Sequence, residues 1–411
     1  MKALVYGLAR SGGAAAARLR ARGEEVVLVD RSLGNEDDLS LLRGVELLVK
    51  SPGVPGEAPL LAAARARGIP VWSELELGWS LLAPSGTRFV AVTGTNGKST
   101  TCELLGAILR CAGRDVVVAG NIGTPLSAVD EARWVVCEVS SFQLEDVHRF
   151  ACEVAVLLNL EPDHLDRHGG FEAYRAAKLR IFERAAVAVV PAGLGLEGIE
   201  FAPEDPLPAE PLMRGLHNRA NAAAATAAAR AVGVADEAIA EALRSFPGIR
   251  HRLEAIGEVH GIRYVNDSKA TNVAASLRAL AAYAGEPVHL ILGGALKGES
   301  FEPLARAIGA NVRSIHLVGE ASASLAAALR DRETSGDRTL SAALQHAAAQ
   351  ACAGEVVLLS PACASYDQYE NFEQRGEEFR ELVAALERAA LSDPRARSRE
   401  DDENATPTRA A

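Results

Sequence analysis

The chain has 411 residues, of which 48% are hydrophobic, and a formal net charge of -11 at pH 7. This length exceeds what one hydrophobic core organises, so two or three domains are expected. The acidic balance argues against nonspecific nucleic-acid binding, which needs a basic surface. No apolar run approaches the ~20 residues that span a bilayer, which argues against membrane insertion.

The N-terminal residues lack the layout of a signal peptide, because a short apolar segment after Lys2 leads directly into a glycine turn at Gly7. The six cysteines are scattered without a Cys-x-x-Cys pair, which indicates a reducing compartment. We therefore expect a cytoplasmic protein that is a monomer, with neither nucleic acid nor membrane as a partner.

Short runs rich in Val, Ile and Leu alternate with Ala/Leu/Arg stretches of helical period along the chain. Continuous apolar strands followed by helices predict parallel sheets covered on both faces, an α/β architecture. The predicted strands are residues 3–6, 26–30, 47–50, 89–93, 116–119, 134–139, 154–159, 263–266, 288–292, 314–318 and 356–359.

Pro/Gly punctuation near residues 83–86 and 246–248 predicts two domain boundaries. The expected domains are residues 1–84, 85–247 and 248–391, followed by a charged tail at 392–411 that we expect to be disordered. Residues 191–211 are rich in Pro, Gly and Glu and are expected to form a loop, whereas the Ala-rich residues 219–231 predict a helix.

The first predicted strand leads into Gly7-Leu8-Ala9-Arg10-Ser11-Gly12, and Asp30 ends the second strand. This resembles a dinucleotide fingerprint, but Ala9 replaces the middle glycine that lets the backbone approach a diphosphate. The alternative is a helix cap with small packing residues.

A second glycine-rich turn, Gly94-Thr95-Asn96-Gly97-Lys98-Ser99-Thr100, stands between a predicted strand and a predicted helix. In this context the turn predicts a phosphate-binding loop, with Lys98 on the β/γ-phosphates and Ser99 on Mg²⁺. Val92 stands where the general motif has its first glycine. The alternative is a glycine-rich turn at a helix cap.

Only six of the 43 basic residues are lysines: Lys2, Lys50, Lys98, Lys178, Lys269 and Lys297. A position that remains Lys in an Arg-rich chain is a candidate for a compact ammonium or an amine that can lose its proton. The last four lie in the motifs, whereas at Lys2 and Lys50 we expect the lysine to be accidental.

The chain resembles the Mur ligases and their folylpolyglutamate synthase relatives from Lys2 to about Leu391. The resemblance is carried by residues 94–101, 120–123, 138–144, 159–166, 174–178, 251–252, 266–272, 360–365 and 367–376. It implies a Rossmann-like N-terminal domain, a central domain with a P-loop ATPase-type parallel sheet, and a C-terminal Rossmann-like domain. Ser-Ser-Phe-Gln-Leu, Asn-Asp-Ser-Lys-Ala-Thr-Asn and Ser-Pro-Ala-Cys-Ala-Ser are similar to the branch that adds D-glutamate.

That resemblance implies ligation of D-glutamate to the carboxylate of UDP-N-acetylmuramoyl-L-alanine in peptidoglycan synthesis. ATP would activate the carboxylate as an acyl phosphate, with two Mg²⁺ ions screening the phosphates. The catalytic and metal-holding residues it implies are Lys98, Ser99, Glu138, His164 and Lys178. Lys178 would act as a carbamate, which requires a lysine whose pKa is lowered by its site.

The resemblance also divides the binding residues into three sets. For ATP it implies Gly94, Thr95, Asn96, Gly97, Lys98, Ser99, Thr100, Asn218, Asn221, Arg252 and Asp267. For the UDP-linked substrate it implies Gly7, Ser11, Gly12, Asp30, Arg31, Ser51, Asn121 and Ser140. For D-glutamate it implies Lys269, Thr271, Lys297, Ser365 and Phe372, although Phe372 could also be a core residue.

Two departures from the family pattern concern loop geometry. Ala295-Leu296 precede Lys297 where the family commonly has Asp followed by Lys or Gly, and residues 187–216 are shorter than usual. We expect the second departure to trim edge strands away from the ATP site; if it removed a wall of the cleft, activity would be lost.

Other hypotheses remain at this point. His164 and His168, four residues apart, could bind zinc, although oxygen ligands and phosphates favour Mg²⁺, and we expect His168 to be solvated. A nicotinamide-dependent oxidoreductase would explain residues 7–12 but not the phosphate loop. A P-loop switch would not need a third domain. A ligase for another amino acid or for folate would differ mainly around residues 360–365.

Overall fold

The computed structural model describes residues 1–121, 123–213 and 215–392. Its contacts divide the chain into two units, one formed by residues 1–212 with 216–246 and the other by residues 213–215 with the chain from Pro247 onward. Residues 393–411 of the expected tail lie outside the described residues, and Ser392 is the last residue of a helix.

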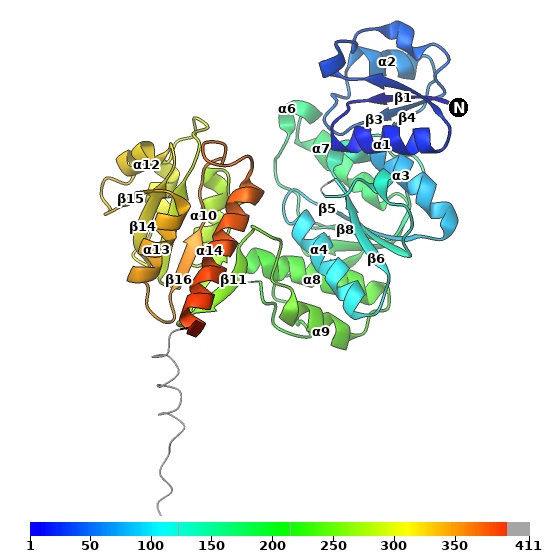
Figure 1. The fold of residues 1–411 in the computed structure, drawn as a ribbon. Coiled ribbons are helices and arrows are strands. Elements are labelled where there is room, and N and C mark those ends of the chain that lie inside the picture. The colour runs from blue at the N-terminus through cyan, green and yellow to red at the C-terminus, as the bar shows by residue number, and fades with distance from the viewer. Residues whose placement is uncertain (122, 214, 393–411) are drawn as a thin grey trace, which may run out of the picture. The chain divides into compact units, whose positions relative to one another are not determined.

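The N-terminal sheet has four parallel strands in the order β2-β1-β3-β4 (Figure 1). Its strands and helices are β1 (Lys2–Tyr6), β2 (Glu25–Val29), β3 (Leu47–Lys50), β4 (Val71–Ser73), α1 (Arg10–Ala21), α2 (Pro59–Ala66) and α3 (Glu74–Leu82). Leu4 and Leu48 face one core while Val5 and Val49 face another. Both faces are covered, which is why β1 and β3 are apolar at nearly every position.

The central sheet has six parallel strands in the order β10-β9-β8-β5-β7-β6. Its elements are β5 (Arg88–Thr93), β6 (Val116–Gly120), β7 (Trp134–Glu138), β8 (Cys152–Leu157), β9 (Ala185–Pro191), β10 (Ile199–Phe201), α4 (Lys98–Cys111), α5 (Ser141–Leu144), α6 (Leu165–His168), α7 (Phe171–Leu179), α8 (Leu216–Ala231) and α9 (Asp236–Ser245). Helices α8 and α9 pack on α4, so β5 and α4 lie at the centre of the unit.

The C-terminal sheet has the order β11-β12-β16-β13-β14-β15, and only β11 runs antiparallel. Its elements are β11 (Glu254–Val259), β12 (Ile262–Asn266), β13 (Val288–Gly293), β14 (Val312–Val318), β15 (Ser335–Arg338), β16 (Val356–Leu359), α10 (Val273–Ala282), α11 (Glu302–Ala307), α12 (Ser322–Ala328), α13 (Leu340–Gln350) and α14 (Phe372–Ser392). Over the described ranges, no helix is both long and apolar enough to cross a bilayer.

Every predicted strand is present, and the expected helix at 219–231 lies within α8. The expectation that residues 191–211 form only a loop is wrong, because β10 lies there as the edge strand of the central sheet. Strands β4, β9, β11 and β15 were also missed. Strand β15, with the sequence Ser-Gly-Asp-Arg, offers no apolar pattern at all, and β4 and β10 have three residues each.

Helix α3 joins the first two sheets into one unit. Its Leu77 belongs to a core of the N-terminal sheet, whereas Leu75 and Leu82 belong to the core of the central sheet. Buried Glu76 accepts hydrogen bonds from three consecutive backbone N–H groups, those of residues 148, 149 and 150, each at 3.0 Å. One helix therefore contributes to both cores. The domain boundary between residues 84 and 85, with a different function on each side, stays a prediction.

The expectation that Lys50 is an accidental lysine is wrong. Its side chain is fully buried at the end of β3, and its Nζ lies 2.6 Å from Asp146 Oδ2 and 3.4 Å from Glu145 Oε2, both in the loop after α5. Arg65 pairs with the other Asp146 oxygen at 2.9 Å. A buried charge is retained only when it is paired, so this cluster ties the N-terminal sheet to the central domain.

We expect Lys50→Ala to lower the free energy of unfolding by about 3 kcal/mol, because the substitution leaves part of the Asp146 charge buried without its partner. Lys2→Ala is the matched control, since Lys2 pairs with Glu25 at the surface and exposed pairs contribute about 0–1 kcal/mol. Urea unfolding of both variants measures the difference. Equal unfolding free energies would show that the buried cluster contributes nothing to the joint.

Candidate active site

The phosphate loop connects β5 to α4. Gly94 and Gly97 have φ angles of 155° and 83°, a region that residues with a Cβ rarely adopt. A Cβ added to Gly97 would also lie 2.3 Å from Asn221 Oδ1 on α8. Glycine at 97 is therefore required both by the turn and by the close approach of α8, which carries the predicted adenine residues Asn218 and Asn221.

Three residues without a predicted role, Asn159, Glu161 and Tyr174, hold this loop in place. The Asn96 N–H donates to Asn159 Oδ1 at 2.9 Å, and Asn96 Nδ2 donates to Glu161 Oε2 at 3.0 Å. The Thr95 hydroxyl lies 2.8 Å from the Tyr174 hydroxyl. All three lie inside segments that carried the family resemblance, which was the only signal for them, and they hold the loop in a fixed shape.

Two lysines converge on one carbonyl of the loop. Lys98 Nζ donates to Gly94 O at 2.9 Å, and Lys178 Nζ, reaching from α7, donates to the same oxygen at 2.8 Å. Lys178 is buried, and its Nζ lies 4.8 Å from the centre of the Tyr174 ring. Burial, together with the charge of Lys98, lowers the pKa of Lys178 from 10.5 to about 7. A large fraction of this amine is therefore unprotonated at neutral pH.

Glu138 ends β7, next to the P-loop strand. It is buried, and it stands opposite Val92 of β5 and Gly120 of β6 in the parallel register. Asn121 Nδ2 donates to Glu138 Oε1 at 3.3 Å. The charge of Glu138 is also among those that act on Lys178. The carboxyl edge of this sheet thus brings a carboxylate, the two lysines and the loop together, as expected for parallel sheets.

Ser99, Thr100 and Ser140 stand at helix starts on this edge. Ser99 and Thr100 lie in the first turn of α4, and Ser140 caps α5, accepting from the Gln143 N–H at 3.3 Å. The hydroxyl of Ser140 is thus already part of a capping box.

The prediction that His168 is solvated is wrong. Its ring is 2% exposed and stacks on Phe142 with an interplanar angle of 2°. Nε2 lies 3.0 Å from Ser141 Oγ, and Nδ1 lies 3.0 Å from Glu145 Oε1. His164, by contrast, has a half-exposed ring and a left-handed backbone at the start of α6. Because both nitrogens of His168 are engaged, the two histidines do not form the zinc pair considered above.

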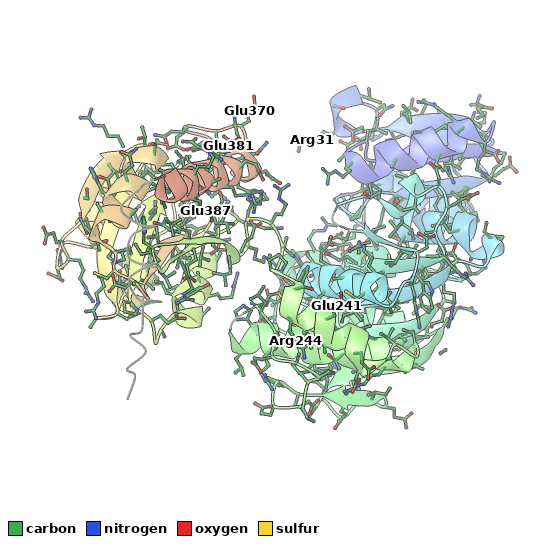
Figure 2. The ribbon with its side chains drawn as sticks, turned by 60° about the horizontal axis from the view of Figure 1, so that its bottom comes forward. Arg31, Glu241, Arg244, Glu370, Glu381 and Glu387 are labelled. Atoms are coloured by element: carbon green, nitrogen blue, oxygen red, sulfur yellow. The ribbon has the colours of Figure 1, made fainter. Side chains whose placement is uncertain are left out.

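A hollow of about 770 Å³ gathers most of the residues predicted for the UDP-linked substrate. Of that set, it is lined by Gly7, Ser11, Asp30, Arg31, Ser51 and Asn121. Tyr6, Arg10 and Glu36 line it as well and were not predicted. Arg31 is exposed, and Figure 2 shows its side chain extending outward from the N-terminal domain. A volume of this size is typical of a binding site for a small molecule.

Hydrogen bonds within the chain shape the glycine turn of this hollow. Ser51 Oγ donates to Gly7 O at 2.6 Å, and Asp30 accepts from the Leu8 N–H at 2.7 Å. Bonds from Ser32 and from Leu8 lower the pKa of Asp30. Gly12 does not line the hollow: a Cβ there would lie 1.7 Å from Gly7 O. Glycine at 12 is therefore required for close packing of α1 on the turn, and its role in substrate binding stays a prediction.

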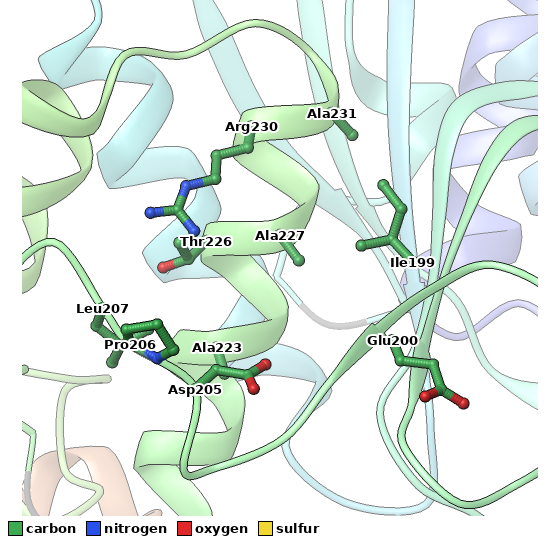
Figure 3. Close-up of a pocket in the computed structure, with 10 residues that line it drawn as sticks. All are labelled: Ile199, Glu200, Asp205, Pro206, Leu207, Ala223, Thr226, Ala227, Arg230 and Ala231. Carbon is green, nitrogen blue, oxygen red and sulfur yellow. The ribbon is translucent and has the colours of Figure 1, made fainter.

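A second hollow, of about 380 Å³, lies between β10, the loop at residues 205–207 and α8 (Figure 3). Ile199 lies across it from Ala227 and Ala231 on the helix. None of the predicted site residues lines it. Residues 187–216 thus still supply most of β9 and the edge strand β10, and β8 separates both from β5 in the sheet order.

In the second unit, Asp267 follows β12 at the carboxyl edge of the sheet. It accepts from Ser360 Oγ at 2.8 Å and from the Leu253 N–H at 3.2 Å. Burial raises the pKa of Asp267 to about 7, although these bonds and the charge of Arg252 oppose the rise. A buried carboxyl with so high a pKa is a candidate functional group.

The residues predicted for D-glutamate surround the same edge. Lys269 Nζ lies 5.6 Å from the centre of the Phe372 ring, and Phe372 is only partly buried, so it is not a core residue. Thr271 is half-buried, Ser365 is buried and Lys297 is exposed. The Ala295 N–H donates to Ala364 O at 2.9 Å. Despite its unusual sequence, the loop before Lys297 is therefore fixed against the segment that carries Ser365.

Arg375, to which the sequence analysis gave no role, organises this edge. Its buried guanidinium donates to Ser268 O at 2.8 Å, Ser268 Oγ at 2.9 Å, and the carbonyls of Cys363 and Ala364 at 3.2 Å. Burial lowers the pKa of Arg375 to about 10. One side chain thus holds the loops after β12 and β16 from the first turn of α14.

The matched family models define the class of this fold and site. The Mur ligase middle domain matches residues 92–194, and the Mur ligase glutamate ligase domain matches residues 251–363. Solved structures with the same fold include UDP-N-acetylmuramate–alanine ligase MurC of Thermotoga maritima, with TM-score 0.57, 18% identity, and coverage of 94% of this chain and 99% of that one. Another is the Escherichia coli FolC in complex with ADP, with TM-score 0.54, 21% identity, and coverage of 76% and 92%.

Closer sequence relatives carry a single name. The UDP-N-acetylmuramoylalanine–D-glutamate ligase of Anaeromyxobacter dehalogenans is 42% identical over 92% of this chain and 96% of the relative. The ligase of the same name from Sphingopyxis alaskensis is 41% identical over 93% and 96%. The chain therefore belongs to the UDP-N-acetylmuramoylalanine–D-glutamate ligase family of Mur ligases. It is an ATP-dependent ligase that forms amide bonds, so the oxidoreductase and the P-loop switch are set aside.

We expect Arg375→Lys to lower the free energy of unfolding by about 3 kcal/mol, because lysine cannot reproduce the planar fork and leaves buried carbonyls unpaired at about 1–3 kcal/mol each. Arg388→Lys, at an exposed position of the same helix, should change it by less than about 0.5 kcal/mol. Denaturant unfolding compares the two. An unchanged Arg375→Lys variant would contradict the role given to the guanidinium.

Proposed function

We propose that the protein joins the amino group of D-glutamate to the terminal carboxylate of UDP-N-acetylmuramoyl-L-alanine, converting ATP to ADP and phosphate. The observation that carries this proposal is the buried Lys178 amine beside Lys98 at the P-loop, in a chain 42% identical to a ligase of that name. The reaction would take place in the cytoplasm, in peptidoglycan precursor synthesis, with the protein acting as a monomer.

ATP would be bound by the loop at residues 94–100 with its adenine toward Asn218 and Asn221. The backbone N–H groups of the loop and the N-terminus of α4 favour a phosphate there. The family resemblance also assigns Arg252 and Asp267 of the second unit to the nucleotide. The UDP-linked substrate would occupy the hollow of the N-terminal domain, where Asn121 also bonds Glu138. Because Asn121 lines the hollow and also contacts Glu138, a substrate bound in the hollow would extend toward the Glu138 carboxylate beside the P-loop.

The chemistry needs two steps. A carboxylate oxygen of the acceptor attacks the γ-phosphorus and ADP leaves, giving an acyl phosphate. The neutral amine of D-glutamate then attacks the carbonyl carbon, phosphate leaves, and the amine gives up a proton as the amide forms. Lys98 would offset the negative charge in the first step, and positioning supplies much of the rate.

The donor atoms at the P-loop fit magnesium. Glu138 is a buried carboxylate and Ser99 a hydroxyl, the oxygen donors that Mg²⁺ prefers. We assign them to one ion and assign His164 with carbamylated Lys178 to a second. Bound magnesium would neutralise phosphate charge as the two anions approach. Lys178 can form the carbamate because its free amine adds to CO₂ with loss of a proton.

For D-glutamate we assign Lys269, Thr271, Lys297, Ser365 and Phe372. Lys297 and Thr271 would hold the side-chain carboxylate, while Ser365 and the backbone of Phe372 would hold its other polar groups. The fixed contact between Ala295 and Ala364 supports this grouping, because it keeps the loops of Lys297 and Ser365 together.

The direct test is ADP release from ATP with UDP-N-acetylmuramoyl-L-alanine as the acceptor. D-glutamate, L-glutamate, L-lysine and diaminopimelate are compared as the second substrate, and the amide product is identified by mass spectrometry. We expect product with D-glutamate alone. Product with another amino acid and none with D-glutamate would refute the specificity, and ATP hydrolysis without an amide would refute the ligation.

We expect Lys178→Ala to reduce kcat at least ~1000-fold if the carbamate holds a metal at the reacting phosphate. Added formate or acetate should restore part of the activity, as a free carboxylate can replace the lost one. Glu172→Ala, at an exposed position of the same helix, serves as the control and should stay active. A variant that is fully active, or inactive with no rescue by either acid, would count against the carbamate.

The pH dependence gives a second test on the intact protein. Because the pKa of Lys178 is lowered to about 7, the free amine grows as pH rises through 7 rather than through 10.5. With ¹³C-labelled bicarbonate, we expect one protein-bound carbamate signal in carbon NMR that is present at pH 8, fades below pH 7, and is absent in Lys178→Ala. A signal that survives in the variant would assign the carbamate elsewhere.

A further inference from the structure

A row of polar side chains crosses the C-terminal sheet on the face that α13 covers. On β13 and β14, Leu290 and Leu317 face the opposite core, and Ile291 and Val318 face the core beneath α13. Residues His289, Ser314 and His316 alternate onto this second face, where an apolar side chain would be expected. The row continues to Asp337 on β15 and to His346 on α13, and it ends at Glu355 on the other side.

Each side chain in this row lies within hydrogen-bond distance of the next one. Glu355 Oε2 lies 2.9 Å from His289 Nε2, and His289 Nδ1 lies 2.8 Å from Ser314 Oγ. Ser314 Oγ lies 2.8 Å from His316 Nε2, and His316 Nδ1 lies 2.9 Å from Asp337 Oδ2. His346 Nδ1 lies 2.5 Å from the other Asp337 oxygen. His316 is completely buried and Asp337 nearly so, whereas His346 is 59% exposed.

With neutral histidines, the hydrogens available are one fewer than these contacts require. Four contacts link Glu355 to Asp337, and each requires one hydrogen. Two neutral imidazoles carry one N–H each and the serine carries one O–H, so the row supplies three. Both carboxylates can only accept. With two neutral imidazoles, one contact is therefore left with two lone pairs facing each other, and either a second proton on one histidine or a cation bound in the row completes it.

A metal ion between His316, Asp337 and His346 completes the row without a second proton on any histidine, and the three side chains already gather there. His316 Nε2–H then donates to Ser314, the serine hydroxyl donates to His289 Nδ1, and His289 Nε2–H donates to Glu355. Every hydrogen is used once, and each histidine is neutral. A chain that fixes the tautomer of a buried ligand is the usual outer shell of a protein metal site.

We propose that Nδ1 of His316, the carboxylate of Asp337 and Nδ1 of His346 form a zinc site that joins β14, β15 and α13. The three ligand atoms lie within 4.8 Å of one another, the one such group among the described residues. Tetrahedral zinc with bonds near 2.05 Å places its ligands roughly 3.3 Å apart, within the spread of distances here. Two imidazoles and one carboxylate favour zinc over magnesium, which prefers oxygen ligands.

This site lies outside the residues assigned to ligation. Its exposed His346 leaves the fourth position open to water. Strand β15 is an edge strand of four residues with no apolar side chain, so its attachment depends on polar contacts. Zinc would hold β15 to the buried β14 and to the helix that covers it.

The test uses the full chain, stripped of metal with a chelator and dialysed into buffer with excess Mg²⁺. We expect zinc titration calorimetry to give one site per chain, and cobalt to give the visible absorption of a tetrahedral site. His346→Ala, at an exposed position that should not affect folding, should abolish both. Ser314→Ala, which removes the hydrogen-bond partner of the His316 ligand, should weaken zinc binding by about 10- to 100-fold.

The matched control is His260→Asn in the exposed turn between β11 and β12, where asparagine tolerates the positive φ of 51°. It should bind zinc as the unaltered chain does. Two results would overturn the proposal: an unaltered chain that binds zinc no more tightly than His346→Ala, or a Ser314→Ala variant with unchanged affinity. Ligase activity is not a readout, so failure here leaves the proposed reaction untouched.

Discussion

The phosphate loop of the central domain depends on one carbonyl oxygen, that of Gly94, which two lysine side chains approach. Gly94 O accepts from both Lys98 and Lys178, which places two amines of the same potential charge on one oxygen of the phosphate loop. Water would normally screen such a pair of charges, but Lys178 is buried. Burial and the charge of Lys98 therefore favour the neutral amine and lower the pKa of Lys178 to about 7. Arginine could not respond in this way, because it does not lose its proton. The chain's general preference for arginine stops at this position for a physical reason.

Four of the six non-glycine residues with positive φ among the described residues lie close in sequence to residues assigned to ligation, whereas His260 and Arg338 do not. His164, His251 and Ala362 adopt positive φ, which residues other than glycine rarely do. Each flanks residues assigned to ligation: His164 is itself a proposed ligand, His251 precedes Arg252, and Ala362 precedes Ser365. Such strain persists only where the surroundings hold it in place. Arg375 supplies part of that hold through its bonds to Cys363 and Ala364.

Polar groups inside the chain have two different uses. The Lys50–Asp146 cluster and the three N–H groups on Glu76 join the N-terminal and central sheets, so the hollow at Gly7 and the P-loop belong to one unit. His168 is also structural: it bonds Ser141 and Glu145 and stacks on Phe142, whose ring centre lies 5.0 Å from that of His164. The row from Glu355 to His346 differs, because neutral histidines leave it one hydrogen short and its last three members gather their ligand atoms within 4.8 Å of one another.

The sequence by itself determined the α/β class, the strands that form the centre of each sheet, the phosphate loop and, through resemblance, the family. These features are local, so a few residues are enough to show them. They are an apolar strand, a turn that only glycine permits, and a lysine retained in an arginine-rich chain. Tertiary structure alone decided the fates of Lys50, His168 and Arg375 and the presence of β10 and β15. Each of these three side chains has a partner far away along the chain: 95 residues for Lys50 and Glu145, 27 for His168 and Ser141, and 107 for Arg375 and Ser268. No local pattern records such pairings. Short edge strands are likewise stabilised by a neighbouring strand rather than by their own composition.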